Sequence, residues 1–267
     1  MRQYLTFFRI RFSTSLQYRA AALAGIATQF AWGGMTIFLY AAFYRANPAD
    51  FPMEFSALSS YIWLQQAFLA LYMSWFLDRD TFDSITRGNI AYDLCRPVSL
   101  YWMWFFKDSA TRIARTLLRC MPILLFAVLL PAPYGLALPE SLSSFLLFLL
   151  TMALGFWMAN ALTLLIYVLC FYTMSPGGLR ILFVSITEFF SGALIPLPFL
   201  PNGFRQFCEL LPFASAQNLP FRIYSGDIAG NEAVFFISLQ LFWILCFTLL
   251  EQLLLKRALK KVVVQGG

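Results

Sequence analysis

Uncharged, mostly apolar stretches alternate along this chain with short polar segments. The first two uncharged stretches span residues 20–44 and 55–77. Because a helix needs about 20 apolar residues to cross the hydrocarbon core of a bilayer, each stretch predicts one membrane-spanning helix. Four later segments extend the pattern, so the sequence predicts an all-α integral membrane protein with a single transmembrane domain over residues 1–267. The six predicted transmembrane helices cover residues 20–44, 55–77, 112–131, 142–172, 180–200 and 233–255.

Turn-forming residues set the limits of the later spans. Pro131 and Pro133 mark the exit of the third helix. The uncharged stretch from residue 141 to residue 179 is too long for one crossing, and a turn signal at 175–178 divides it near Tyr172. The fifth span contains Glu188 and ends in a segment rich in proline.

The chain begins with a basic amphipathic segment. Residues 1–19 contain four arginines and no acid, and Leu5, Phe8, Phe12 and Leu16 recur at helical spacing. This pattern predicts an interfacial helix that lies along an anionic leaflet, with Arg9 and Arg11 as anchors. A solvated basic leader is the alternative.

A second segment outside the spans, residues 201–232, mixes short apolar runs with charges. Phe204–Leu211 predicts a short amphipathic helix, and Pro212–Pro220 predicts a turn back toward the last span. Because the apolar runs are too short to cross a bilayer, we expect short re-entrant or interfacial helices that form an outer hairpin. An ordinary extracellular loop is the alternative.

The composition supports the membrane class. Hydrophobic residues make up 60% of the chain and charged residues 12%, whereas soluble domains carry about 25% charged residues. Histidine is absent, which removes the commonest proton shuttle and metal ligand. The five cysteines are scattered without a paired motif, and no phosphate-binding Gly-rich loop with Gly-Lys-Ser/Thr is present. We therefore expect no metal site and no cofactor bound by this chain.

The charged insert between the second and third spans, residues 78–119, holds 12 of the 32 charged residues. It predicts breaks at Arg87–Asn89 and at Arg96–Pro97, because glycine and proline interrupt helices. Trp102 and Trp104 follow, and we expect them to anchor the chain at headgroup depth. The length and the mixed charges of the insert favour a docking surface for another subunit over a plain loop. The spacing of Asp78, Asp80 and Asp83 resembles a cation site, but the interleaved arginines favour a solvated charge cluster.

The distribution of basic residues predicts the orientation. With the N-terminus inside the cell, the inner segments carry 16 Lys and Arg residues and the outer loops carry three. Basic residues concentrate in cytoplasmic loops, so both termini are expected in the cytoplasm. The net charge of +6 is explained in the same way and does not indicate nucleic acid.

Glu188 is the one carboxylate that lies deep within a predicted span. A carboxylate inside a membrane is costly and suggests a functional site, while a protonated or arginine-paired structural Glu is the alternative. The Ser191–Gly192–Ala193 sequence and the prolines after it predict a bend in the fifth helix.

The six spans, the basic leader, the stretch Leu94-Cys95-Arg96-Pro97-Val98-Ser99 and the short outer helices resemble the permeases of bacterial type-2 ATP-binding-cassette (ABC) exporters, in a compact subfamily of about 260 residues. The resemblance implies two permease chains, identical or paralogous, joined to two cytoplasmic ABC ATPase subunits that bind ATP and Mg, in the bacterial inner membrane. It places the ATPase-coupling element at about residues 80–96, where the expected coupling residues are Asp80, Asp83, Arg87, Asp93, Arg96 and Pro97. The residues expected to line or gate the translocation path are Glu188, Gly192, Pro196, Pro198, Phe204 and Phe207.

The sequence therefore predicts a non-enzymatic permease that exports a drug-, lipid-, peptide- or glycan-like substrate. Two alternatives stay open. An ion-gradient-driven transporter or channel would usually contain more intramembrane polar groups than Glu188. An intramembrane lipid enzyme would need clustered acids, histidines or a serine dyad, which makes it the weaker alternative.

Overall fold

A computed structural model describes residues 2–17 and 19–261, and within them the fold is all-α. Three helices are long and apolar enough to cross a membrane: α2 (Arg19–Ala46), α8 (Leu142–Thr173) and α12 (Gly230–Leu259). The all-α membrane class is thus confirmed. The other predicted spans fall on shorter or partly charged helices, so the six-span arrangement stays a prediction. These helices are α3 (Phe55–Ala67), α4 (Leu69–Tyr72), α7 (Leu100–Leu129) and α9 (Pro176–Phe190).

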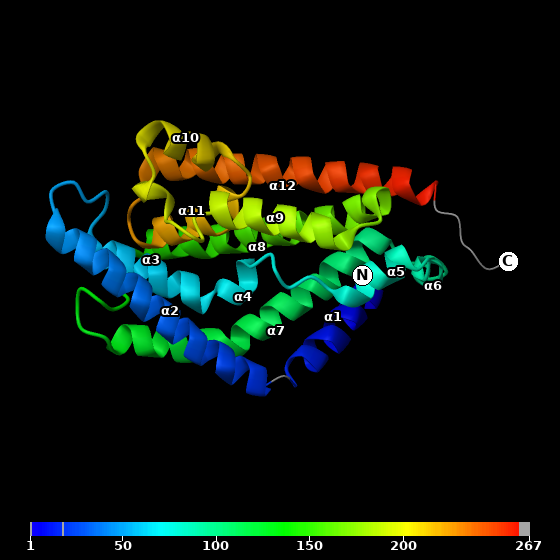
Figure 1. Cartoon of the computed structure of the whole chain (residues 1–267), viewed down its shortest axis with the longest axis horizontal. Helices are drawn as coiled ribbons and strands as arrows, with labels where there is room; N and C mark the ends of the chain where they lie inside the picture. The colour runs from blue at the N-terminus through cyan, green and yellow to red at the C-terminus, as the bar shows by residue number, and fades with distance from the viewer. Residues whose placement is uncertain (1, 18, 262–267) are drawn as a thin grey trace.

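Short helices lie at both ends of an elongated bundle (Figure 1). One end carries α5 (Arg79–Thr86), α6 (Ile90–Leu94) and the last turns of α12. The other end carries α10 (Asn202–Leu210) and α11 (Ala214–Tyr224). We call these the inner end and the outer end.

The charged insert is only partly a loop. The predicted breaks at 87–89 and 96–97 are present. The predicted spans 55–77 and 112–131 leave residues 78–111 as the cytoplasmic coupling loop, but α7 already begins at Leu100 within it. The aromatic run of the insert explains the early start, because Tyr101 and Trp104 are 2% exposed and pack inside the bundle. The predicted coupling loop 78–111 is therefore irregular or short-helical only as far as Ser99.

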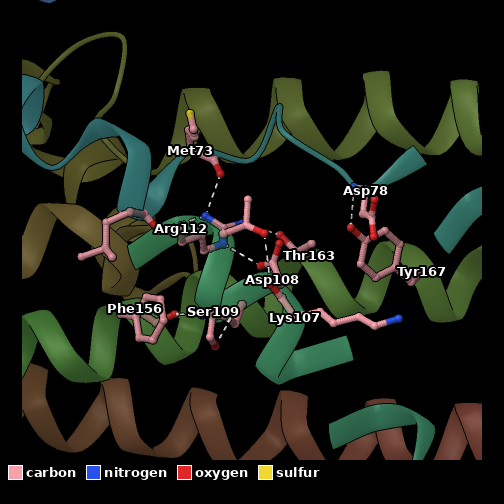
Figure 2. A network of polar contacts seen from close by, with 12 residues as sticks. Met73, Asp78, Lys107, Asp108, Ser109, Arg112, Phe156, Thr163 and Tyr167 are labelled. Atoms are coloured by element: carbon pink, nitrogen blue, oxygen red, sulfur yellow. Dashed lines mark hydrogen bonds and ion pairs between the residues drawn. The ribbon is translucent and has the colours of Figure 1, made fainter. Parts of the chain in front are cut away.

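The second predicted span ends early for a physical reason, shown in Figure 2. Helix α4 stops at Tyr72, and the guanidinium of Arg112 on α7 donates hydrogen bonds to the carbonyls of Leu71 (2.9 Å) and Met73 (2.8 Å). The same guanidinium donates to Asp108 at 2.6 Å and to Thr163 on α8 at 2.7 Å. The last carbonyls of a helix have no hydrogen-bond partner within the helix. Here the buried guanidinium of Arg112 donates hydrogen bonds to them.

This Arg112 network lies between two apolar cores. The outer core joins α2, α3, α11 and the outer halves of α7 and α8, with Tyr61 and Ile123 fully buried. The inner core joins α5, α6 and the inner halves of α7 and α8, with Met103 and Leu164 fully buried. A buried hydrogen bond from Ser109 to Asn160 (3.2 Å) lies at the same level as the Arg112 network.

The outer hairpin differs from its prediction. Only residues 212 and 213 form a turn; residues 214–220 belong to α11, which continues through Pro220. Proline removes the hydrogen bond that the carbonyl of Ala216 would accept. That carbonyl instead lies against Gly155 on α8, where a Cβ would stand only 2.0 Å away. Close packing of α11 on α8 thus accommodates the proline.

Helix α1 (Arg2–Ser15) packs along the first half of α7. Its packed face is one position away from the predicted apolar face: Tyr4 stacks on Phe106 at 5.7 Å and Ser15 is buried. Leu5 and Ile10 are 57% and 62% exposed. The helix therefore offers an apolar surface in addition to its docked face, and its contact with lipid stays a prediction.

Removal of the Arg112 guanidinium should destabilise the fold. We expect R112Q to cost about 3–5 kcal/mol, because Asp108 would be left buried and unpaired. R112K should recover little, since an ammonium lacks the planar fork that reaches several acceptors. The measurement is thermal unfolding of the purified protein in detergent. R87Q is the matched control, and its exposed pair with Asp83 should contribute no more than about 1 kcal/mol; equal shifts for R112Q and R87Q would contradict this account.

Candidate functional sites

The short helix α5 is fixed to the bundle at its start. The backbone N–H of Asp78 donates to the hydroxyl of Tyr167 on α8 at 2.8 Å, and Arg11 of α1 donates to the Asp78 carboxylate at 2.7 Å. One turn later the Phe82 ring packs edge-on against Tyr167, with 5.1 Å between centroids. Helix α5 is therefore attached to α8 at two points, both on Tyr167.

The opposite face of α5 carries exposed charges of both signs. The side chains of Asp80, Asp83 and Arg87 are 86%, 57% and 71% exposed. Arg87 and Asp83 lie 3.7 Å apart, but a pair so open to solvent contributes little stability. These three predicted coupling residues share one surface and remain available to a partner.

The connection from α6 to α7 holds the other predicted coupling residues. Arg96 lies 3.8 Å from Asp93 and 5.6 Å from the centre of the Phe7 ring, so it bridges this connection to α1. Pro97 is exposed between the two helices. Tyr92 on α6 is 75% exposed among these charges, and the sequence analysis did not single it out. Exposed tyrosines are favoured at protein interfaces.

The predicted interfacial anchors divide into two kinds. Arg9 is exposed, while Arg11 is held in its ion pair with Asp78. Trp102 is half-buried beside Trp157. Trp104 is 2% exposed and lies inside the inner core, so the expectation that it anchors the chain at headgroup depth is not supported. Its ring packs between helices because α7 begins before it.

Glu188 lies near the end of α9 and is half-buried. Its carboxylate accepts a hydrogen bond from the indole N–H of Trp75 at 2.9 Å. Trp75 belongs to the non-helical stretch that follows the Arg112-capped end of α4. The side chain is therefore not paired with an arginine among the described residues, in contrast to the structural alternative raised by its sequence position.

Gly192 forms the bend after α9. It adopts φ 77°, and its carbonyl lies 3.4 Å from both the Tyr61 hydroxyl and the Gln65 amide of α3. Gln65 also donates to the next carbonyl at 2.8 Å. Pro196 and Pro198 are buried in the segment that follows. The α-helix of the predicted span 180–200 thus ends at Phe190, because a left-handed glycine and two prolines prevent its continuation, and a short 3-10 turn follows at Leu197–Phe199.

Phe204 and Phe207 lie on α10 and are 40% and 53% exposed. Both rings approach Phe190 at the end of α9, with centroids 6.4 and 6.5 Å away. The predicted path residues are therefore grouped around the end of α9 and α10, far along the bundle from α5 and α6 (Figure 1).

A buried ion cluster at the outer end was not predicted. Arg222 on α11 donates to Glu209 on α10 and to Asp227 after α11, and its side chain is 4% exposed. The sequence pattern places these three residues in the predicted outer hairpin 201–232, for which an ordinary loop is the alternative. The available signal in the sequence was that residues 209–227 contain acidic and basic side chains close enough along the chain to pair.

A second missed group is Glu251 on α12. Its side chain is fully buried and accepts a hydrogen bond from the Tyr101 hydroxyl at 2.9 Å. Glu251 lies close to the end of the predicted span 233–255, whereas α12 continues to Leu259. Glu188 is therefore not the one carboxylate enclosed by apolar helices.

The aspartates whose spacing resembled a cation site lie beside arginines. Asp78 pairs with Arg11 and Asp83 lies near Arg87. Within the described part of the chain, no group of three or more His, Cys, Asp and Glu residues is arranged to hold a metal ion.

The long apolar helices are typical of a membrane protein, and the exposed charges of α5 and α6 lie at one end of it. Residues 30–266 match the family model described as ABC-2 family transporter protein. The chain therefore belongs to this family, as the resemblance predicted. The family consists of membrane components of ABC transporters, so the chain is a permease that associates with an ABC ATPase subunit on which ATP hydrolysis takes place. Comparison with curated proteins finds no match.

The backbone of Gly192 provides a test of the outer bend. G192A should lower stability by roughly 1–2 kcal/mol, because a left-handed conformation is costly for a residue with a Cβ. The new Cβ would also lie 3.1 Å from the Tyr61 hydroxyl oxygen and 3.2 Å from a side-chain oxygen of Asn218. G203A is the control, since a Cβ there meets open space on α10. Thermal unfolding of both variants in detergent is the measurement, and an unchanged melting temperature for G192A would contradict the expected strain.

Proposed function

We propose that this chain is the permease subunit of an ATP-driven exporter in a bacterial cell membrane. It would cross the membrane six times with both termini in the cytoplasm and move a drug-, lipid-, peptide- or glycan-like substrate out of the cytoplasm or inner leaflet. Two permease chains, identical or paralogous, would associate with two ATPases that bind ATP and Mg, while this chain binds no cofactor of its own. The observation that carries the proposal is the exposed two-signed surface of α5 and α6, together with the family assignment.

The orientation is supported by the arrangement of the ends. The start of α1 and the last turns of α12 lie at the same end of the bundle as α5 and α6 (Figure 1). Arg112 and Arg222 are buried in ion pairs, so they drop out of the count of loop charges. The count of 16 inner and three outer basic residues then becomes 15 and two, which leaves the bias unchanged in direction.

The proposed mechanism uses the attachment of α5 to α8. Closure of the ATPases would press on Asp83, Arg87 and the neighbouring charges of the coupling element. Because α5 contacts Tyr167 of α8 through both Asp78 and Phe82, the displacement would pass into the bundle. Movement of α8 would reach α4 and α7 through the Arg112 network and alter the region around Glu188.

Charge reversal on α5 tests the coupling surface. We expect R87E to weaken association with the partner ATPase tenfold or more, because a like-charge contact at an interface costs several kcal/mol and about 1.4 kcal/mol is tenfold. Co-purification of the ATPase and ATP-dependent transport into inverted vesicles are the measurements, and two ATPases per two permeases is the expected composition. D50K is the control, since Asp50 is exposed in the connector between α2 and α3. Transport that persists without ATP, driven by an ion gradient, would overturn the proposal in favour of a secondary transporter.

Neutralisation of Glu188 tests the path. E188Q keeps an oxygen that can accept the Trp75 hydrogen bond but removes the carboxylate charge. We expect transport to fall several-fold while ATPase association stays unchanged, because the change lies far from α5. E232Q, an exposed carboxylate in the first turn of α12, is the control. If E188Q transports as well as the unmodified protein, Glu188 does not act in the path.

A further inference from the structure

A cavity of about 230 Å³ opens where α1, the start of α2 and the middle of α7 meet. Three arginines line it, Arg11, Arg115 and Arg119, and no carboxylate does. A cavity needs only about 10–15 Å³ to hold one water molecule, so this one admits a larger polar group with its hydration. It is separate from the exposed face of α5 and from the region around Glu188.

The protein balances the positive charge of this cavity only in part. Arg11 lies near Asp78 and Asp80, while Asp108, on the far side of Arg115, is bonded to Arg112. Within residues 2–17 and 19–261, neither Arg115 nor Arg119 forms an ion pair. The two arginines are one helical turn apart, where like charges destabilise a helix. An anion bound between them would convert this repulsion into attraction.

Both arginines are held in place with unused donors. The Arg115 guanidinium stacks over the Phe76 ring at 4.2 Å. The Arg119 guanidinium lies against Gly25 of α2, where a Cβ would stand 2.6 Å from its central carbon. Arg119 makes one long hydrogen bond, 3.4 Å to the carbonyl of Ala21, and its Nε is buried without a partner. The absence of a side chain at residue 25 thus creates the space that Arg119 occupies.

The position of the cavity along the helices identifies the kind of anion. Arg119 is the last charged residue of α7, and residues 120–139 are uncharged. On α2 the uncharged stretch begins at Ala20, beside the same cavity. Two helices therefore change from charged to apolar at this level, which is where lipid headgroups meet the hydrocarbon core. Planar guanidinium groups bind phosphate oxygens in a bidentate manner.

We propose that Arg115 and Arg119, with Arg11 at the rim, bind the phosphate group of an anionic phospholipid headgroup. Clustered basic side chains beside membrane helices attract anionic lipids, and this cavity gives that attraction a defined geometry. The inference requires that the helices lie in a membrane, but it does not require an ATPase partner or export.

The test uses the purified full-length chain in a non-ionic detergent without ATPase. Short-chain phosphatidylglycerol, phosphatidylcholine of the same chain length and inorganic phosphate are titrated separately. Binding is followed by native mass spectrometry and by the shift in melting temperature. We expect saturable binding of phosphatidylglycerol at least tenfold tighter than that of phosphatidylcholine. If inorganic phosphate competes fully at the same concentration, the ligand is free phosphate and the lipid assignment is overturned.

Four variants assign the binding to this cavity. R115Q and R119Q should each weaken phosphatidylglycerol binding about tenfold, and R119K should be intermediate because the charge remains without the fork. G25A keeps every charge but displaces the Arg119 guanidinium, so it should also weaken binding.

The control is R180Q, which removes an exposed arginine at the start of α9 and should bind as the unmodified chain does. The melting temperature of each variant without lipid separates lost binding from lost folding. Wild-type binding by both R115Q and R119Q, or an equal loss in R180Q, would overturn the site.

Discussion

The buried pair of Arg112 and Asp108 is the constraint on which the bundle depends. Removing two charges from water is costly, and the cost is met only when nearly every donor has a partner. Here the guanidinium contacts a carboxylate, a hydroxyl and two backbone carbonyls at 2.6–2.9 Å, which fixes α4, α7 and α8 at one level. Apolar contacts alone would allow these helices to slide against one another, whereas directional hydrogen bonds allow little displacement.

The Arg112 network lies between the inner and the outer core, and the two ends of the molecule differ in the residues that they expose. The inner core supports exposed charges on α5 and α6, which are connected to the network through Tyr167 on the same face of α8 as Thr163. The outer core supports the bend at Gly192, which is held by hydrogen bonds from α3. The aromatic residues of α10 pack on Phe190, just before that bend. In the proposed mechanism, a change in position of the inner helices would reach the outer end through polar contacts that have defined directions.

Features set by local sequence could be predicted, and those set by distant partners could not. The apolar stretches 20–44 and 142–172, the interruption at Gly88 and the bend at Gly192 all follow from residues near one another in the chain. The burial of Arg112 depends on carbonyls about 40 residues earlier, and that of Glu251 depends on Tyr101, 150 residues away. The packed face of α1 lies one position away from the predicted apolar face. The reason is that Phe7 packs under Arg96 and Lys107, and these contacts with distant residues cannot be predicted from the helical spacing of apolar residues.

The Arg222 cluster has a consequence for the order of assembly. Its partners are only five and 13 residues away along the chain, whereas Arg112 and Thr163 are 51 residues apart. Contacts between residues close in sequence form first, since less chain entropy is lost in closing a short loop. The unit formed by α10, α11 and Asp227 can therefore close before α12 has been synthesised. Helix α12 then packs on a surface that has already formed, and Gln240 of α12 donates hydrogen bonds to the carbonyls of Ser215 and Thr151.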